Sequence, residues 1–600
     1  MTAYLVKGEH NVRSKSKWIV AVIAVAFIAA SCGDSKSSSS SGTTAPGASA
    51  ATTPATTTKA PVSGGTITFG TFSETAGLDP IVSSGNGVTG YIEMNAIYDT
   101  IVRYNPSTGK YDMNTAESVT SNADSTEWTV KLKPNIKFTD GTPYDAAAVQ
   151  FGMNRHRSGI PGAPPCAELY ACPRNVTSSA AYMALVKSID VVDPLTVKFT
   201  LTEPWAAFQY ALSAEAAMIP SPTAIKKCAP ATGGAPGSGD VKLCEFNQKP
   251  VGAGPFKIDS YKTKDSITML KNADYWNGTV YLDGLKFVNS IADAGGDQTF
   301  AALTTGTFNM AFLRDPATVA AAHDKKFDGV STIEQGGGLL LINQGNSVTC
   351  AKEQPAPICT GKPDGVLTSN PPTKDVKVRQ AIAAAVDPAV LNARGYQGKG
   401  LVGNQLFQSD FRWFANVAGP KVDVEAAKKL VADAKAAGWD GKLRLLYNSS
   451  PTAAAIGLAT QTMLQNVGMT VTLDTGKDTN AQIVQVTQLK DFDVTGWGLA
   501  IPPDDGAVWA LAQNFASTST SNRIGFKSTV VDQALKDIRQ AKTDDEKKVA
   551  YKKIADVMTA EVPSLPFAKI EEFIAWAPNI HGMIQTDRSG VAFNKAWIDK

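Results

Sequence analysis

The most constraining feature of the chain is a strand–helix–strand pattern within about thirty residues in its second half. Residues 443–447 (LRLLY) fit a buried strand, residues 452–466 fit a helix, and residues 469–473 (MTVTL) fit a second strand. Two strands joined by one helix over so short a distance pair in parallel, because the helix returns the chain to the same edge of the sheet. The pattern predicts a parallel sheet covered by helices, and therefore the fold class α/β.

Two other segments alternate polar and apolar residues, as half-buried strands of an antiparallel sheet do. They are residues 127–132 (EWTVKL) and 195–201 (LTVKFTL), and residues 146–153 between them favour a helix. The folded region is expected to begin with a strand at residues 64–69 (GGTITF). Together these segments predict two or more α/β lobes, and we find no internal repeat.

Capping residues predict where two helices begin and end. Asp423 precedes an apolar stripe at positions 427, 430, 431 and 434, and Gly438 follows it, which is typical of a helix capped at both ends. Thr543 and Glu546 have the spacing of a capping box. Prolines 563 and 566 are expected to stop that second helix after about residue 559, because proline cannot continue a helix.

The charge balance argues against a nucleic-acid partner. The chain has 57 Lys and Arg residues against 55 Asp and Glu residues, and it has no long basic run beyond its first residues. Its composition, 43% hydrophobic and 19% charged, is that of a soluble globular protein. Its 600 residues exceed what one hydrophobic core holds, so several domains are expected.

The N-terminus predicts export and a lipid anchor. Basic residues between positions 7 and 17 precede an apolar run at residues 18–30, which is too short to span a membrane and suits a signal peptide over residues 1–31. The run ends in Ala-Ala-Ser-Cys, which resembles a bacterial lipoprotein signal with Cys32 as the lipidated residue, although Ala29 stands where Leu is usual. An ordinary cleaved signal with an incidental cysteine is the alternative. Residues 32–64 are rich in Ser, Thr, Ala and Pro and are expected to form a disordered tether.

The six remaining cysteines fall into three close pairs, as expected of disulfides that close short loops in an exported chain. A metal site is the alternative, but no pair has a histidine at ligand spacing. The predicted pairs are Cys166 with Cys172, Cys228 with Cys244, and Cys350 with Cys359.

Eight segments, in order, resemble the family 5 extracellular solute-binding proteins, the dipeptide-, oligopeptide- and nickel-binding group of ABC importers. The resemblance extends from about residue 64 to residue 583. Its segments are GGTITFGTFSETAGLDP, IYDTIVRYNPSTGK, AESVTSNADSTEWTVKLKPNIKFTDGTPYDAAAV, PVGAGPFKI, LKNADYW, FAALTTGTFNMAF, VKVRQAIAAAVD and VDQALKDIRQAKTDDEKKVAYKKIADVMTAEVPSLPF.

The resemblance implies a two-lobed, periplasmic-binding-protein-like fold (type II, cluster C) with an extra inserted α+β domain. Lobe I would comprise residues 65–110, 245–335 and 561–600, the inserted domain residues 111–244, and lobe II residues 336–560. The lobes of such a protein close on a ligand, and the closed form is delivered to an ABC permease in the cytoplasmic membrane. The chain is accordingly expected to be a monomer on the outer face of that membrane, to carry no cofactor, and to be no enzyme.

The resemblance also places a candidate ligand site at residues 496–505 (GWGLAIPPDD). Peptide-binding relatives have a Trp-x-x-Asp segment whose carboxylate holds the ligand's ammonium group. Trp497 is retained here, but the position of the Asp is Ala500. Because a buried ammonium without its carboxylate costs about 3–5 kcal/mol, a non-peptide or atypical ligand is favoured over a peptide. Asp504 and Asp505 could replace the missing carboxylate.

Trp497, between Gly496 and Gly498, could offer an aromatic face to a sugar ring, a planar group or a cation. We expect a neutral or weakly charged organic solute there; the alternative is that Trp497 packs in the lobe core. Trp509 is expected in the core.

Three residues elsewhere in the chain are also candidates to contact the ligand. Thr71 and Phe72, after the first strand, are expected on one wall of the site, and Asn343 on the opposite wall.

Metal binding and catalysis are not supported by the residue patterns. Of the four histidines, His10 lies in the signal region and is expected to be lost on processing, and His323 and His581 are isolated. His156 lies between Arg155 and Arg157 and is expected on a solvated basic face. No Gly-x-Ser-x-Gly, His-Glu-x-x-His or phosphate-loop motif is present. An extracytoplasmic hydrolase that uses acidic residues, and a ligand sensor on the same fold, stay open as alternatives.

Overall fold

A sheet of 11 strands organises the chain, in the order β17-β16-β18-β12-β19-β11-β1-β10-β9-β8, with the short β15 (Leu401–Val402) beside β19. The computed structural model describes residues 59–599 except 76, 83–89, 159, 161, 171–182, 228–243, 290–294, 351–358, 360–364, 520 and 588. The predicted signal peptide, Cys32 and most of the predicted tether lie outside these residues. Residues Ala60–Lys600 form one compact unit.

The strands fall into two half-sheets. The first half-sheet contains β11 (Met310–Leu313), β1 (Thr66–Gly70), β10 (Gly284–Val288), β9 (Ser266–Lys271) and β8 (Phe256–Lys262). The second half-sheet contains β18 (Val494–Trp497), β16 (Lys442–Asn448) and β17 (Thr470–Lys477). β16 and β17 pair in parallel and are joined by α12 (Pro451–Asn466), so the predicted strand–helix–strand unit is confirmed.

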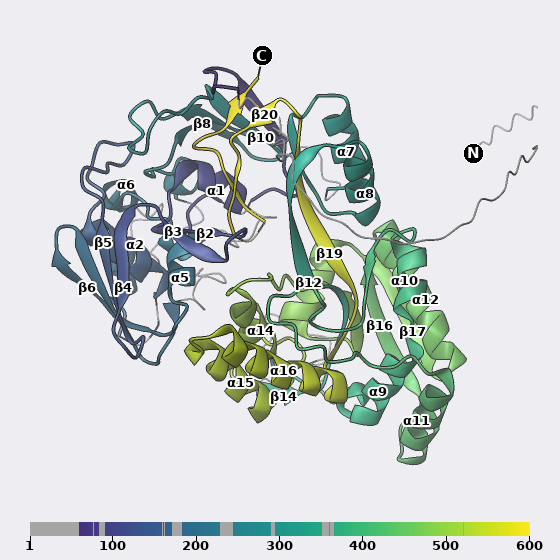
Figure 1. Ribbon diagram of the computed structural model, residues 1–600. Coiled ribbons are helices and arrows are strands. Elements are labelled where there is room, and N and C mark those ends of the chain that lie inside the picture. The colour runs from purple at the N-terminus through teal and green to yellow at the C-terminus, as the bar shows by residue number, and fades with distance from the viewer. Residues whose placement is uncertain are drawn as a thin grey trace, which may run out of the picture. The chain divides into compact units, whose positions relative to one another are not determined.

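Two long antiparallel strands join the half-sheets, and we call them the central ribbon. They are β12 (Asp328–Ile342) and β19 (Ser564–Trp576), and Figure 1 shows them side by side through the middle of the fold. One end of β19 pairs with β11 and the opposite end of β12 pairs with β18. The register shifts between Glu334 and Leu339, where Gly336 has φ of 69°, a left-handed value that glycine adopts without strain.

Helices cover the half-sheets. The apolar face of the second half-sheet packs against α9 (Val376–Ala385), α10 (Pro388–Gly395), α11 (Val424–Ala436) and α12. The first half-sheet packs against α1 (Tyr91–Ile97), α7 (Asp297–Thr304) and α8 (Pro316–Asp324). Asp423 caps α11 by accepting a hydrogen bond from the Ala426 N–H, as predicted.

A separate antiparallel sheet has the order β4-β5-β7-β6. Its strands are β4 (Ala116–Ser121), β5 (Glu127–Leu132), β7 (Thr196–Leu201) and β6 (Val186–Asp193). The two strands predicted from alternation, β5 and β7, are direct neighbours. The hairpin of β2 (Val102–Asn105) and β3 (Lys110–Met113) precedes this sheet. The helix predicted at residues 146–153 is confirmed as part of α2 (Ala146–His156).

Three helices near the C-terminus share one apolar cluster with the small sheet. They are α14 (Ala507–Phe515), α15 (Thr529–Gln540) and α16 (Asp544–Glu561). The ring centroids of Trp205 and Trp509 lie 4.6 Å apart, and both indoles are buried, which confirms Trp509 as a core residue. Thr543 and Glu546 form the predicted capping box at the start of α16.

The expectation of a solvated basic face at the end of α2 is wrong. Arg155, His156 and Arg157 are each about 1% exposed. Asp79 holds the Arg155 guanidinium through two hydrogen bonds of 2.8 and 2.7 Å. Burial, and then the charge of Arg155, lower the pKa of His156 to about 3, so it is neutral. Arg155 is buried here because a carboxylate from a distant segment neutralises its charge.

Within the described part of the chain, no helix combines the length and the apolar character that crossing a membrane requires.

Candidate functional site

Trp497 ends β18 beside the central ribbon, directly opposite Leu339 of β12. The indole is half-buried at the margin of the large apolar cluster. The guanidinium carbon of Arg523 lies 5.5 Å from the ring centroid, so a cation covers one face of the ring. The side chain is therefore neither fully packed in the core nor open on both faces.

The glycines on either side of Trp497 are required by close packing. A Cβ on Gly496 would overlap the ring of Tyr447. A Cβ on Gly498 would lie 2.6 Å from the Gly337 carbonyl oxygen and 3.9 Å from Nη2 of Arg314. Gly498 and Ala500 are nevertheless solvent-exposed, so the segment after β18 offers open backbone next to the ribbon.

Thr71 and Phe72 follow β1 but differ in their surroundings. Thr71 is buried, and its hydroxyl donates to Oδ1 of Asn289 (2.7 Å), so its role is to hold two segments of the first half-sheet together. Phe72 is half-buried and packs edge-on against Phe312. The guanidinium of Arg314 lies 5.8 Å from the Phe72 ring.

Arg314, which the sequence analysis missed, connects Phe72 to the segment at Trp497. It follows β11 in the first half-sheet, and its Nε lies 3.2 Å from Oε1 of Glu572 on β19. Glu334, on the facing strand of the ribbon, is also buried. Burial, and then the charge of Glu572, raise the pKa of Glu334 well above its usual range, so its neutral form is favoured. A charged residue directly after the apolar strand 310–313 was the signal in the sequence.

Asp505 is committed to contacts within the protein. Its Oδ1 accepts from Nζ of Lys547 on α16 (2.5 Å), and its Oδ2 accepts from the hydroxyl of Tyr111 on β3 (3.1 Å). This carboxylate thus joins the segment after β18 to the hairpin that precedes the small sheet.

Asp504 is 4% exposed and accepts from the Gly506 N–H. Burial, and then the charge of Asp587, raise its pKa to about 8. Asp504 is therefore largely protonated at neutral pH, whereas a carboxylate that receives an ammonium group must be ionised. The proposed replacement for the missing Asp at Ala500 has no support from this geometry.

Asn343 does not lie beside Trp497. The register of β12 and β18 places Leu339 opposite Trp497 and Ile342 opposite Val494, so Asn343 lies at the far end of the pair, roughly 13 Å along the strands. Its amide nitrogen donates to the carbonyl oxygen of Phe492 (2.8 Å). The side chain closes a turn of the backbone.

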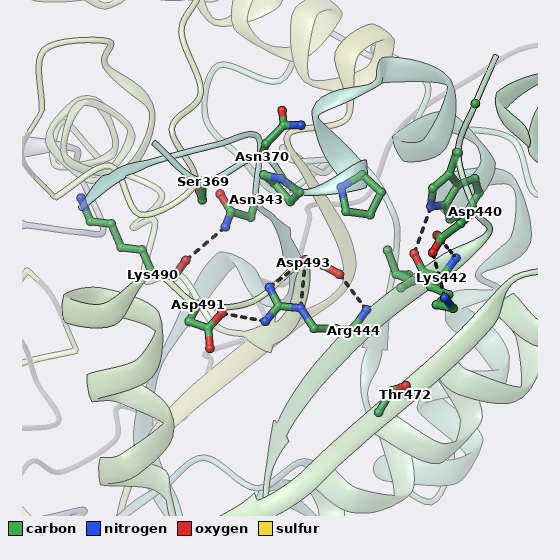
Figure 2. A pocket seen from close by; sticks show the side chains of 15 residues that line it. Asn343, Ser369, Asn370, Asp440, Lys442, Arg444, Thr472, Lys490, Asp491 and Asp493 are labelled. Carbon is green, nitrogen blue, oxygen red and sulfur yellow. Dashed lines mark hydrogen bonds and ion pairs between the residues drawn. The ribbon is translucent and has the colours of Figure 1, made fainter. Parts of the chain in front are cut away.

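Asn343 instead lines a surface pocket of about 850 Å³ at the outer end of the second half-sheet (Figure 2). Five of the charged side chains that line this pocket pair with one another. Arg444 contacts Asp491 (2.6 Å) and Asp493 (3.0 Å), and Lys442 contacts Asp440 (3.0 Å). Because these charges are already balanced, the pocket shows no preference for a charged ligand.

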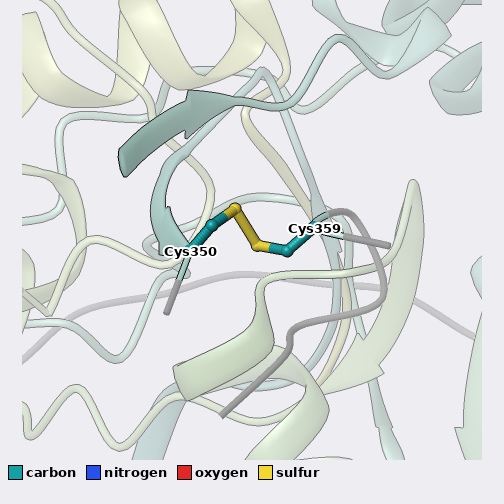
Figure 3. The surroundings of a disulfide bond; sticks show 2 residues. All are labelled: Cys350 and Cys359. Carbon is teal, nitrogen blue, oxygen red and sulfur yellow. A yellow bond between two sulfur atoms is a disulfide. The ribbon is translucent and has the colours of Figure 1, made fainter. Parts of the chain in front are cut away.

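One predicted disulfide is confirmed among the described residues. Cys350 and Cys359 are bonded, with Cα atoms 5.5 Å apart, and close a short loop next to β13 (Ser347–Cys350) (Figure 3). Cys244 is also disulfide-bonded, while its predicted partner Cys228 lies outside the described residues. Cys172 lies outside them too, so the predicted bond of Cys166 stays a prediction.

The side chains that come together at the ribbon derive from both half-sheets, and we call this group the ribbon site. Among the described residues no group of three or more acidic, His or Cys side chains is arranged to hold a metal ion. The side chains of the ribbon site offer a ligand aromatic faces and guanidinium groups, and Gly498 adds exposed backbone. Its members are Phe72, Arg314, Glu334, Glu572, Trp497, Gly498 and Arg523.

Comparison with known proteins gives one family match. Residues 110–519, more than half of the chain, match the sequence model of the bacterial extracellular solute-binding proteins, family 5. The glutathione-binding protein GsiB of Escherichia coli K12 is 25% identical over 496 residues, which cover 80% of this chain and 85% of that protein.

Solved structures share the fold. The oligopeptide-binding protein AppA of Bacillus subtilis, in complex with a nonapeptide, has a TM-score of 0.68 at 20% identity and covers 90% of this chain and 100% of its own. The binding protein AgaA of A. tumefaciens R10, in complex with agropinic acid, has a TM-score of 0.67 at 24% identity and covers 89% and 99%.

Proposed function

Because the chain belongs to the bacterial extracellular solute-binding proteins of family 5, which serve ABC importers outside the cytoplasm, we propose that it captures an organic solute at the ribbon site. We propose further that two lobes close on the solute and that the closed form delivers it to a permease in the cytoplasmic membrane. The protein would act by binding alone, as a monomer, without catalysis.

The observation that carries the proposal is the position of the ribbon site. Its side chains come from the first half-sheet (Phe72 and Arg314), from the second (Trp497), and from the ribbon that joins them (Glu572). The register shift and the left-handed Gly336 lie at the same place. A bend of the ribbon there would change the distances among these side chains, as in a hinge that opens and closes around a ligand.

This placement of the hinge supports lobe boundaries that lie at the central ribbon. We propose that lobe I comprises residues 65–110, 245–335 and 561–600, with the domain 111–244 inserted in it, and that lobe II comprises residues 336–560. The register shift of β12 after Glu334 supports the boundary at residue 335.

We propose that the solute is not an ordinary peptide. Ala500 is exposed and uncharged, Asp505 is paired with Lys547, and Asp504 is buried and largely protonated. No carboxylate of this segment is therefore free to receive a peptide's ammonium group. The relatives whose names or titles mention glutathione, a nonapeptide or agropinic acid indicate that one scaffold accepts different organic solutes.

We propose that Cys32 is lipidated and that residues 33–64 tether the binding unit to the outer face of the cytoplasmic membrane. The basic and apolar N-terminus and the Ala-Ala-Ser-Cys sequence support this assignment. The test is fractionation of cells that express the parent or Cys32→Ala: the parent should stay with membranes, and the variant should be released. Release of both would contradict the anchor.

Native mass spectrometry of residues 60–600, purified without unfolding, tests the binding function. We expect an additional mass from one small organic molecule, which Trp497→Ala retains less well than the parent does. A ladder of peptide masses would refute the proposed ligand class. The bare protein mass alone, from cells grown in rich medium, would contradict capture of a solute.

A further inference from the structure

Arg523 is partly buried, and its surroundings are unlike those of the other arginines that the fold desolvates. It lies between α14 and α15, and its Nη1 donates to Oδ1 of Asn514 on α14 (2.8 Å). Its own carbonyl oxygen accepts from the Asn346 side chain, so backbone and side chain are both held. The guanidinium is thus fixed over the Trp497 ring, 5.5 Å from its centroid.

This guanidinium has no acidic partner among the described residues. Burial is the only cause that lowers the pKa of Arg523, and no nearby carboxylate opposes the effect. The other described arginines whose pKa burial lowers each have an acidic neighbour: Asp190 for Arg157, Glu561 for Arg379 and Glu203 for Arg539. A desolvated cation without a counter-charge is unfavourable in the protein alone, and it is stabilised by any anion that binds beside it.

A second guanidinium approaches the same segment from the first half-sheet. Nη2 of Arg314 lies 3.9 Å from where a Cβ of the exposed Gly498 would stand. The carboxylate of Glu572 lies 3.2 Å from Nε of Arg314 and balances its charge. The contact is an ion pair, because Nε makes no hydrogen bond. The adjacent residues Trp497 and Gly498 therefore have one guanidinium each as a neighbour.

The acidic groups nearest to these two guanidinium groups leave the charge of Arg523 unopposed. Glu572 is paired with Arg314, and the raised pKa of Glu334 favours its protonated form, which is able to donate a hydrogen bond. Asp504 is also largely protonated at neutral pH. The groups around Trp497 thus supply donors and one uncompensated positive charge.

We propose that Arg523, together with Arg314, makes the ribbon site selective for an organic solute that carries a carboxylate. This inference rests on the proposed binding function and names its substrate class. A guanidinium binds a carboxylate through two parallel hydrogen bonds, which neither an amide nor an ammonium group can reproduce. Arg523 determines specificity by direct contact, and Trp497 holds its plane in position.

The test is a thermal-shift screen of residues 60–600 with organic acids, amines and neutral metabolites, in which benzoate is matched with benzamide and glutarate with glutaramide. Titration calorimetry then measures the dissociation constants of the stabilising compounds. We expect these compounds to be carboxylates, bound about tenfold to hundredfold more tightly than their amides. In Arg523→Gln this preference should fall below about threefold, since the charge-assisted bonds are lost.

Arg394→Gln is the control, because Arg394 is an exposed arginine of α10 and its loss changes the net charge equally. It should bind the carboxylates as the parent does. Stabilisation by amines or neutral compounds instead of acids would overturn the inference and leave the binding function intact. If Arg523→Gln kept the parent's preference for carboxylates over their amides, the inference would also be overturned and the binding function would be left intact. If no compound stabilised the parent, the inference and the proposed function would both fail.

Discussion

The hydrogen bond between Tyr111 and Asp505 should control how long the protein retains its solute. Tyr111 lies on β3, before the small sheet, and Asp505 follows β18 of the second half-sheet. With the lobe boundaries proposed above, the bond joins parts that separate when the lobes open. Tyr111→Phe removes the donor and preserves the ring. The closed form would lose this bond, whereas the open form would lose nothing.

The magnitude follows from the geometry of the acceptor. A hydrogen bond to a charged group contributes about 1.5–3 kcal/mol, and the lower end applies because Asp505 keeps its ion pair with Lys547 at 2.5 Å. About 1.4 kcal/mol corresponds to a factor of ten. If this bond exists only in the closed form, Tyr111→Phe should speed dissociation of the solute by roughly tenfold.

The assay is a chase by dialysis, in which native mass spectrometry measures the fraction of protein that still holds the co-purified molecule. Tyr144→Phe is a suitable control, because Tyr144 shares a hydrogen bond of 3.2 Å with Thr115 within the small-sheet region. This control should lower stability without changing the release rate. Equal release from Tyr111→Phe and the parent would refute the idea that this contact belongs to the closed form.

Three further predictions concern stability. Asp79→Asn leaves the buried guanidinium of Arg155 without its counter-charge and should lower the free energy of unfolding by about 3–5 kcal/mol in urea titrations; a loss below about 1 kcal/mol would contradict the buried pair. Folding raises the pKa of Asp504 from 3.8 to about 8, so its contribution to stability is complete below about pH 4 and is lost as the pH rises through about 8. Asp504→Asn should flatten this dependence in thermal melts, and an unchanged pH profile would refute the assignment. Replacing Cys350 and Cys359 by serine opens a loop with a sequence separation of 9 and should cost about 2–3 kcal/mol, so denaturation midpoints equal to those of the parent would be contrary to expectation.

Local patterns predicted the local elements well. The caps at Asp423 and Thr543 and the strand–helix–strand unit at 442–477 depend on residues close in the chain, so spacing was sufficient to identify them. The 15-residue strand β12 was harder, because three consecutive glycines at 336–338 suggest a loop. Its pairing with β19, more than two hundred residues away, makes it a strand nonetheless.

The candidate site was only partly predictable for the same reason. The family resemblance of its segment made Trp497 a candidate, but nothing near it in the sequence indicates that Arg314 and Arg523 approach it. The basic run at 155–157 is buried because Asp79, 76 positions earlier, neutralises Arg155. Charge in a sequence indicates exposure unless a distant partner is known, and only the tertiary fold brings that partner close.

Small-angle X-ray scattering of residues 60–600 tests whether two lobes close on a solute about the central ribbon. The co-purified molecule is removed by reversible unfolding, and scattering is recorded before and after the extracted molecule is added back. If the lobes close, the radius of gyration is smaller with the molecule than without it, and the response is weaker in Trp497→Ala. Identical scattering curves at a saturating concentration of the molecule would contradict closure about the ribbon.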